Sequence, residues 1–194
     1  MRHVSVTFSD PKPVYSDPDD ADVMNLRDRL LSALTEAEVG TVIPLSLKGT
    51  MLSASCHARL LGPALRMVAS GEAPGRYVVV EDPGGANDWD ADAALRKLSA
   101  DGPTKLVCVW NTGGDRPLLV GDVDRGVKET YDFVYDREKE GSAATTRELA
   151  EAYGMRIQAA SNRVTKAASL GVVRTVEERP AEGGGVQRLL VPVR

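Results

Sequence analysis

The strongest constraint on the fold lies near the C-terminus, where helix-capping residues and glycines fall at fixed intervals. Thr145 and Glu148 have the spacing of a capping box, in which a hydroxyl and a carboxylate each satisfy a free backbone amide at a helix start. Gly154 is placed to end this helix in a tight turn. A second helix is expected over 157–169, because small apolar residues recur on one side of it.

The residues after the second helix predict a two-stranded hairpin. Residues 170–173 read Leu-Gly-Val-Val, which stops the helix and begins an extended segment. Two stretches with strand character follow at 174–179 and 186–191, and a tip containing three glycines joins them. The predicted order is therefore helix, tight turn, helix, strand, glycine loop and strand.

This order resembles the winged helix-turn-helix superfamily of bacterial transcription regulators. The residues that carry the resemblance are Thr145, Glu148-Leu149-Ala150, Gly154-Met155 and Leu170-Gly171-Val172-Val173. The resemblance implies that the second helix enters the major groove of double-stranded DNA, where the base edges display a complete donor and acceptor code.

The solvent side of the second helix provides candidate DNA contacts. Gln158 and Asn162 lie one helical turn apart, and each can read an adenine edge, whereas Arg163 and Lys166 suit phosphates. The alternative is that this surface is simply solvated and that the module serves dimerisation. The complete set of expected DNA-binding residues is Arg156, Gln158, Asn162, Arg163, Thr165, Lys166, Arg179 and Arg188.

The charge is distributed unevenly along the chain. From Ser142 onward there are eight basic and five acidic residues, so this part carries +3, whereas the whole chain carries −4 and the rest therefore −7. Such asymmetry is a modest indication of a nucleic-acid-facing module. Glu177, Glu178 and Glu182 lie on the hairpin and would weaken its attraction to DNA. We therefore expect that DNA affinity depends on a homodimer, which reads a pseudo-palindrome.

The first 123 residues alternate apolar strands with amphipathic helices, which predicts an α/β fold with a mixed or parallel sheet. We expect three parts: an α/β sensor or partner-binding domain over 1–123, a connecting helix over 124–141, and the winged module over 142–194. The expected strands lie near 4–8, 41–47, 77–80, 106–110 and 118–120, and the expected helices near 24–37, 55–69 and 89–98.

The layout of the first part is similar to that of STAS-like domains of bacterial regulators. The matching residues are a strand at 42–47, the helix start at 52–56 and a strand at 77–80. The resemblance implies a protein partner and a serine that is phosphorylated at the helix start, where Ser53 and Ser55 lie. A phosphate there would meet the positive helix end, although serines at this position are more often plain caps.

Two glycine pairs follow apolar strands and are candidate ligand loops, since α/β sheets hold ligands at strand ends. They are Gly84-Gly85 and Gly113-Gly114, and neither forms part of a GxGxxG fingerprint or a P-loop. Ordinary turns are the alternative. A small nucleotide-binding enzyme is therefore a third hypothesis, after a DNA-binding regulator and a STAS-like signalling or defence-system component that uses the winged helix for assembly.

Other classes of function find little support in the sequence. The chain is 42% hydrophobic and 27% charged, as in ordinary globular proteins, and its two cysteines, Cys56 and Cys108, form no CxxC pair. No catalytic or metal-binding motif is present, so we expect no enzyme activity, cofactor or metal. No long apolar run occurs, and we expect a cytoplasmic protein that does not span a membrane.

Overall fold

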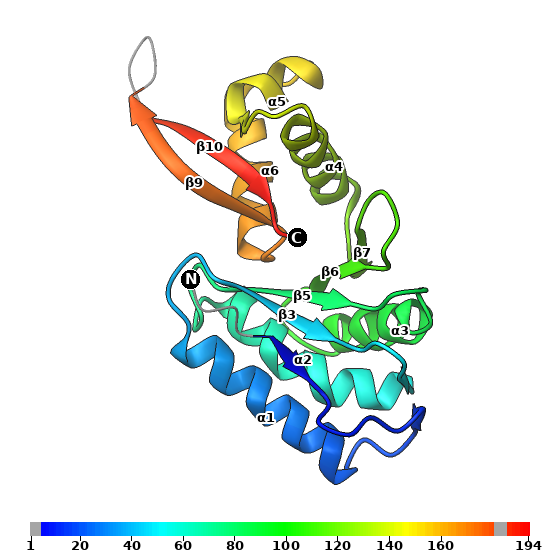
Figure 1. Ribbon diagram of the computed structural model, residues 1–194. Coiled ribbons are helices and arrows are strands. Elements are labelled where there is room, and N and C mark those ends of the chain that lie inside the picture. Colours follow the sequence, from blue (N-terminus) through cyan, green and yellow to red (C-terminus); the bar gives the residue numbers. More distant parts are fainter. Residues whose placement is uncertain (1–4, 181–185) are drawn as a thin grey trace. The chain divides into compact units, whose positions relative to one another are not determined.

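The computed structural model describes residues 5–180 and 186–194 and divides into two compact units (Figure 1). Unit 1 comprises residues 1–123 together with Arg194, and unit 2 comprises Asp124–Val193. The helix expected over 124–141 as a connection therefore belongs to unit 2. No helix of the described residues is both long enough and apolar enough to cross a membrane.

Unit 1 is built on a five-stranded sheet in the order β1-β3-β5-β6-β7. The first four of these strands run parallel, and β7 pairs antiparallel with β6. The α/β class and the mixed sheet predicted from the sequence are thereby confirmed. The strands are β1 (Val6–Thr7), β3 (Val42–Ser46), β5 (Tyr77–Glu81), β6 (Val107–Asn111) and β7 (Leu118–Gly121).

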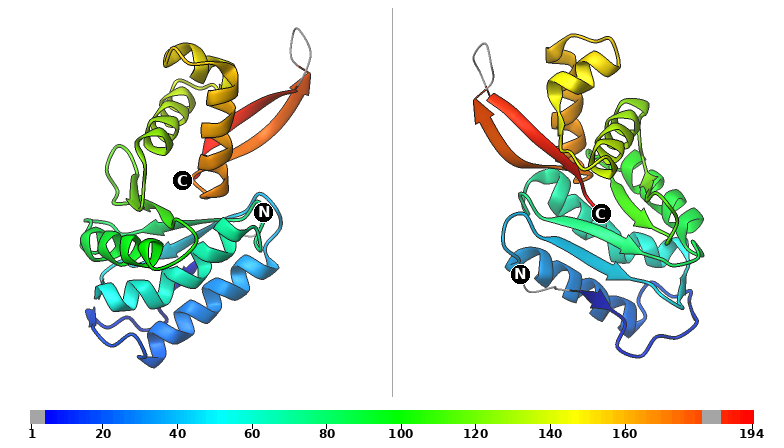
Figure 2. Two further views of the ribbon diagram at one scale, coloured as in Figure 1. Left: turned by 180° about the vertical axis from the view of Figure 1, so that it is seen from behind. Right: turned by 45° about the horizontal axis from the view of Figure 1, so that its top comes forward.

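Three helices cover one face of this sheet: α1 (Ala21–Glu36), α2 (Ala54–Ser70) and α3 (Asp88–Ala100). Each helix joins one parallel strand to the next strand along the sheet. Because such crossovers are right-handed, successive steps in the same direction place every helix on the same face, as Figures 1 and 2 show. The main apolar core lies between the helices and this face; buried members from the strands include Ile43, Leu45, Val78, Val80, Cys108 and Trp110.

A small parallel pair, β2 (Val14–Tyr15) and β4 (Met51–Leu52), lies apart from the main sheet. The sequence analysis did not predict it, because two-residue strands are too short to show an alternating pattern. The pair places the chain in front of α2, since the Ser53 amide donates to the Tyr15 carbonyl at 3.0 Å.

Unit 2 contains three helices, α4 (Arg125–Lys139), α5 (Thr146–Ala152) and α6 (Ile157–Ser169). The expected capping box is present at the start of α5. The Glu148 amide donates to the Thr145 hydroxyl at 3.2 Å, and the Thr145 amide donates to the Glu148 carboxylate at 2.8 Å. Gly154 adopts a left-handed conformation in the turn between α5 and α6, where a residue with a Cβ would be strained.

The strands of unit 2 form an antiparallel sheet in the order β8-β10-β9. They are β8 (Ala144–Thr145), β9 (Val173–Pro180) and β10 (Val186–Pro192). The hairpin of β9 and β10 matches the expected one, whereas β8 was not expected because it is only two residues long. The element order of unit 2 is therefore helix, strand, helix, helix, strand and strand.

At Gly121 in β7 the backbone lies very close to the Leu106 carbonyl that precedes β6. Replacement of this glycine tests whether the two strands approach each other so closely. Its φ is +113°, and a Cβ there would lie 2.3 Å from the Leu106 carbonyl oxygen. We expect Gly121→Ala to lower the free energy of unfolding by at least about 3 kcal/mol, because backbone strain adds to steric overlap. Urea unfolding of the full chain measures this loss.

Gly113→Ala is the matched control, because Gly113 also has a positive φ, +83°, but has no atom within 4 Å of the added Cβ. Backbone strain alone should then cost about 1–2 kcal/mol. Equal losses for the two variants would show that the close approach at Gly121 is not real.

Candidate nucleic-acid interface

Helix α6 has an inner face of small side chains that fixes its orientation in unit 2. Ala160, Val164 and Ala167 are buried and lie three or four residues apart, so they share one side of the helix. Small residues at these positions let the helix pack closely against its neighbours. The rest of the helix surface must therefore face away from this packing or toward α4.

The outward surface of α6 consists of uncharged hydrogen-bonding side chains. Gln158, Asn162 and Thr165 are exposed and follow one another at intervals of four and three residues. The Gln158 amide donates to the Asn162 side-chain oxygen at 3.3 Å, which shows that the two amides lie side by side. Arg156, the N-cap residue of the helix, is also exposed. These four expected DNA-binding residues are thus brought together at the surface.

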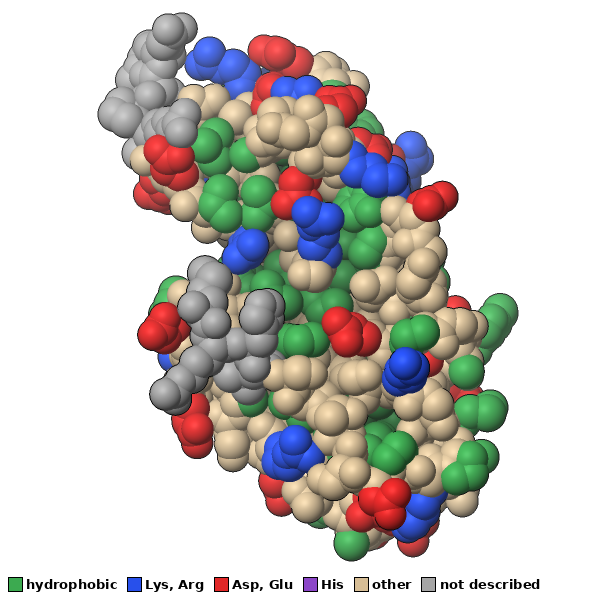
Figure 3. Space-filling view, viewed as in Figure 1, with side chains coloured by type: hydrophobic (Ala, Val, Ile, Leu, Met, Phe, Trp, Pro, Cys, Tyr) green, Lys and Arg blue, Asp and Glu red, His purple; other side chains and the backbone are tan. Residues whose placement is uncertain are grey.

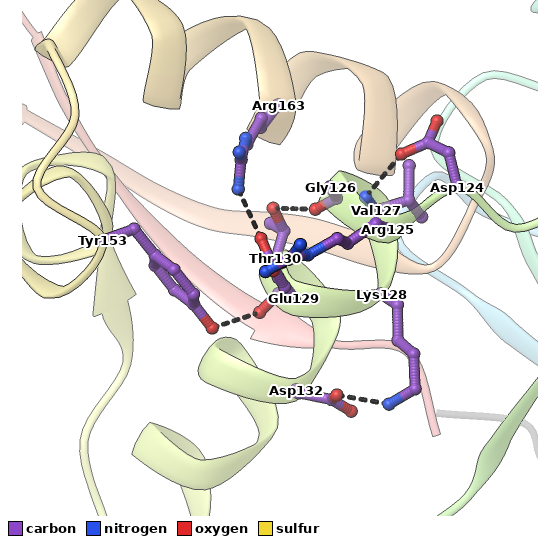
Figure 4. A network of polar contacts seen from close by, with 10 residues as sticks. All are labelled: Asp124, Arg125, Gly126, Val127, Lys128, Glu129, Thr130, Asp132, Tyr153 and Arg163. Carbon is purple, nitrogen blue, oxygen red and sulfur yellow. Dashed lines mark hydrogen bonds and ion pairs between the residues drawn. The ribbon is translucent and has the colours of Figure 1, made fainter.

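The two expected phosphate-binding residues of α6 instead pair with carboxylates of unit 2. Arg163 is half-buried, and its guanidinium lies 2.8 Å from the Glu129 carboxylate in α4 (Figure 4). Lys166 forms an ion pair with Asp124, the N-cap residue of α4. Both were expected on the solvent side of the helix. Lys166 is exposed there, whereas Arg163 is half-buried because α4 packs against α6, a contact that no local sequence pattern records.

Glu129 is the centre of this polar network. Its carboxylate accepts from Arg125 at 2.6 Å and from Arg163 at 2.8 Å, and its backbone carbonyl accepts from the Tyr153 hydroxyl at 3.2 Å. The hydrogen bond from Arg125 is the main cause that lowers the pKa of Glu129, and Arg163 adds to it. The carboxylate is therefore ionised near neutral pH and pairs with both guanidinium groups.

The charge balance of unit 2 differs from that expected for 142–194. Residues 124–193 contain eleven basic and eleven acidic side chains. The α4 helix itself has four of each, and its two capping residues, Asp124 and Glu140, add the acids that balance the basic excess of the later residues. Figure 3 shows blue and red side chains intermixed over the visible face of this unit rather than gathered in a basic patch. The unit is formally neutral, so any attraction to phosphates must come from a few local side chains.

The hairpin carries the remaining two expected residues. Arg188 in β10 is exposed and pairs with Glu178 of β9 at 3.0 Å. Arg179 is the last residue but one of β9, and its side chain lies outside the described part of the structure, as does Glu182. Of the two expected arginines of the hairpin, Arg188 is therefore the one whose side chain is described, and it is already paired.

In unit 1, the two candidate serines lie at the start of α2. Ser53 is its N-cap and accepts a hydrogen bond from the Cys56 amide at 3.4 Å. The Ser55 hydroxyl is exposed and lies 2.9 Å from the Ser53 hydroxyl. Ser53 therefore has a capping role, which was the alternative considered from the sequence.

The two glycine loops meet at the carboxyl ends of β5 and β6. The Gly84 amide donates to the Thr112 carbonyl at 3.1 Å, the Gly85 amide to the Asp82 carbonyl at 2.9 Å, and the Gly113 amide to the Asn111 side chain at 3.0 Å. Gly114 lies beside them, next to the Thr112 side chain. Three of the four amides thus serve the loops themselves, which is the behaviour of ordinary turns.

Beneath these loops lies a buried polar cluster that the sequence analysis did not identify. The Asp82 carboxylate accepts from the Trp110 indole at 3.1 Å and from the backbone and side-chain nitrogens of Asn87 at 2.9 and 3.0 Å. Asn87 also donates to the Thr50 carbonyl at 2.8 Å and accepts from the Leu52 amide at 2.7 Å. The cluster therefore ties the loop before α3 to β4 and β6.

His57 of α2 completes this cluster. It is fully buried, and its ring packs edge-on against Trp110 with 5.7 Å between ring centroids. Neither ring nitrogen makes a hydrogen bond of good geometry to a described residue. Burial lowers the pKa of His57 to about 4, although the nearby carboxylates of Asp90 and Asp82 act in the opposite direction. The imidazole is therefore neutral near pH 7.

Comparisons with known proteins do not assign the chain to a family. No protein-family model matches the sequence, and neither a curated protein nor a solved structure matches it. Among the described residues, no group of three or more His, Cys, Asp or Glu side chains is placed to hold a metal ion.

The buried imidazole predicts a pH dependence of stability. Unfolded histidine binds a proton near pH 6.5, whereas folded His57 binds one only near pH 4, so protonation favours the unfolded chain between these values. We expect His57 to remove up to about 3 kcal/mol of stability as the pH falls through this interval. The measurement is urea unfolding across the interval for the native chain and His57→Gln, whose difference isolates this group.

The other histidine of the chain supplies the control. The His3→Gln variant, measured in the same way, gives the contribution of the other histidine to the pH dependence. A native chain and a His57→Gln variant with parallel pH profiles would contradict the assignment of a neutral, buried imidazole.

Proposed function

We propose that unit 2 is a winged helix module and that the protein is a DNA-binding transcription regulator. Two features support this proposal. In unit 2 the order α5, α6, β9 and β10 is the order of helices and strands on which the resemblance to winged helix-turn-helix modules is based. Helix α6 also occupies the place of the second, groove-reading helix in that motif.

The main support for the proposal is the row of exposed side chains on the outward surface of α6, Gln158, Asn162 and Thr165, which we call the outward row. Gln158 and Asn162 present exposed amides, and a side-chain amide can form two hydrogen bonds with an adenine edge in the major groove. Thr165 continues the row with a hydroxyl, and Arg156 adds a cation at the helix start. Uncharged donors and acceptors on an exposed helix are better suited to hydrogen bonding with base edges than to electrostatic attraction of phosphates.

We further propose that unit 1 senses a ligand or a protein partner and that two copies of the chain act together. The neutrality of unit 2 supports the second part, because phosphate contacts supply most non-specific affinity and one copy offers few of them. A dimer doubles these contacts and reads two half-sites about one helical turn of DNA apart.

A second candidate function is that unit 2 docks a protein. Exposed apolar side chains at the α5–α6 turn favour it, since Tyr153 is 40% exposed and Ile157 is 54% exposed. The internal pairing of Arg163 and Lys166 also fits a surface that does not meet phosphates. A DNA-binding module shows saturable binding that weakens steeply with salt, whereas a protein-docking module does not bind duplex DNA in this way.

Substitution of the amide row tests the proposal for base reading. We expect Gln158→Ala combined with Asn162→Ala to abolish enrichment of preferred sequences from a random duplex library, because the adenine contacts are lost. Affinity for bulk duplex DNA should change by less than about twofold, since neither side chain carries charge. Unchanged sequence enrichment in the double variant would rule out this surface as the base-reading one.

Substitution of Arg156 tests the phosphate contact at the start of α6. We expect Arg156→Ala to weaken binding to all sequences alike and to reduce the slope of log affinity against log salt by about 1. Arg66→Ala is the matched control, because Arg66 is an exposed arginine on α2 of unit 1 and its loss changes the net charge equally. Similar slopes for both variants would speak against α6 as the DNA contact.

A further inference from the structure

The basic side chains of α6 are held by the first turns of α4. Lys166 pairs with Asp124 and Arg163 pairs with Glu129, so one cation in each of two successive turns of α6 meets a carboxylate of the neighbouring helix. These are the same two residues whose charge and position suit DNA phosphates. Within unit 2, the carboxylates of Asp124 and Glu129 therefore lie where DNA phosphates would lie in a complex.

Asp124 performs two functions with its two oxygens. Its Oδ1 accepts from the Val127 amide at 2.9 Å and caps α4, and its Oδ2 pairs with Lys166. Asp124 is also the first residue of unit 2 and follows directly on Val123 of unit 1. The residue that neutralises Lys166 is therefore also the residue at which the chain enters unit 2.

Arg163 lies against the first turn of α4, next to Gly126. A Cβ at Gly126 would lie 3.5 Å from the Arg163 Nε and 3.3 Å from the Asp124 Oδ1. From this position the guanidinium reaches Glu129 (Figure 4). The Tyr153 ring lies beside the same guanidinium, 6.0 Å from its central carbon. Arg163 is therefore held from two sides.

We propose that the start of α4 is an autoinhibitory element, which neutralises Lys166 and Arg163 until its first turns rearrange and release both cations to DNA. This inference rests on the proposed DNA-binding function. Both ion pairs are partly open to water, since the Arg163 and Lys166 side chains are 36% and 49% exposed, so phosphates can reach these cations and compete with the carboxylates. Any change that displaces the backbone at Asp124 would alter the charge that α6 presents, which gives unit 1 a covalent route to regulate unit 2.

Two isosteric substitutions test this proposal on the full chain. Asp124→Asn keeps a good N-cap residue but removes the charge that holds Lys166, and Glu129→Gln does the same for Arg163. We expect each to raise affinity for a random-sequence duplex about threefold at low salt and to steepen the salt dependence by about one phosphate contact. Fluorescence anisotropy over a series of salt concentrations gives both quantities.

Asp132→Asn is the matched control. Asp132 pairs with Lys128 on α4 itself, so its substitution changes the net charge by the same amount without releasing a cation of α6. An equal gain for Asp132→Asn, or no gain for Asp124→Asn and Glu129→Gln, would overturn the proposal. If the native chain and all variants fail to bind duplex DNA, the proposed function itself fails, whereas equal binding by all of them refutes only the autoinhibition.

Discussion

The packing of α6 through Ala160, Val164 and Ala167 is the constraint on which the account of unit 2 depends. These small side chains bury one side of the helix, and helical periodicity then decides where every other side chain points. Gln158, Asn162 and Thr165 are consequently exposed, whereas Arg163 turns toward α4. The burial of this one side of α6 therefore determines which side chains are exposed to a partner and which, such as Arg163, pair with α4 instead.

The charges of unit 2 limit the DNA affinity that the exposed surface of α6 could provide. A basic excess over 142–194 suggested general attraction to DNA, but unit 2 also includes α4 with its capping residues Asp124 and Glu140, whose two carboxylates make the unit neutral. Base-reading amides without a strongly basic surround would bind DNA weakly as single copies. Such a module depends on a second copy or on release of its own cations, and both offer points of regulation.

The sequence predicted the features that arise from local periodicity. The bounds of α6, the capping box of Thr145 and Glu148, and the alternation of strands and helices in unit 1 agree with the structure, because short-range signals specify them. The ion pairs of Arg163 and Lys166 join residues more than thirty positions apart in the sequence, and the cluster around Asp82 and His57 joins four chain segments. No local pattern records such contacts, so only the tertiary structure shows them.

The central claim is that the outward row of α6 meets the major groove. Amide chemical-shift mapping of the full chain, titrated with duplex DNA selected from a random library, tests it most directly. We expect the largest saturable shifts on residues 156–166, with smaller ones on the hairpin. Saturable binding whose shifts leave α6 unchanged, or that fall on unit 1 alone, would contradict it.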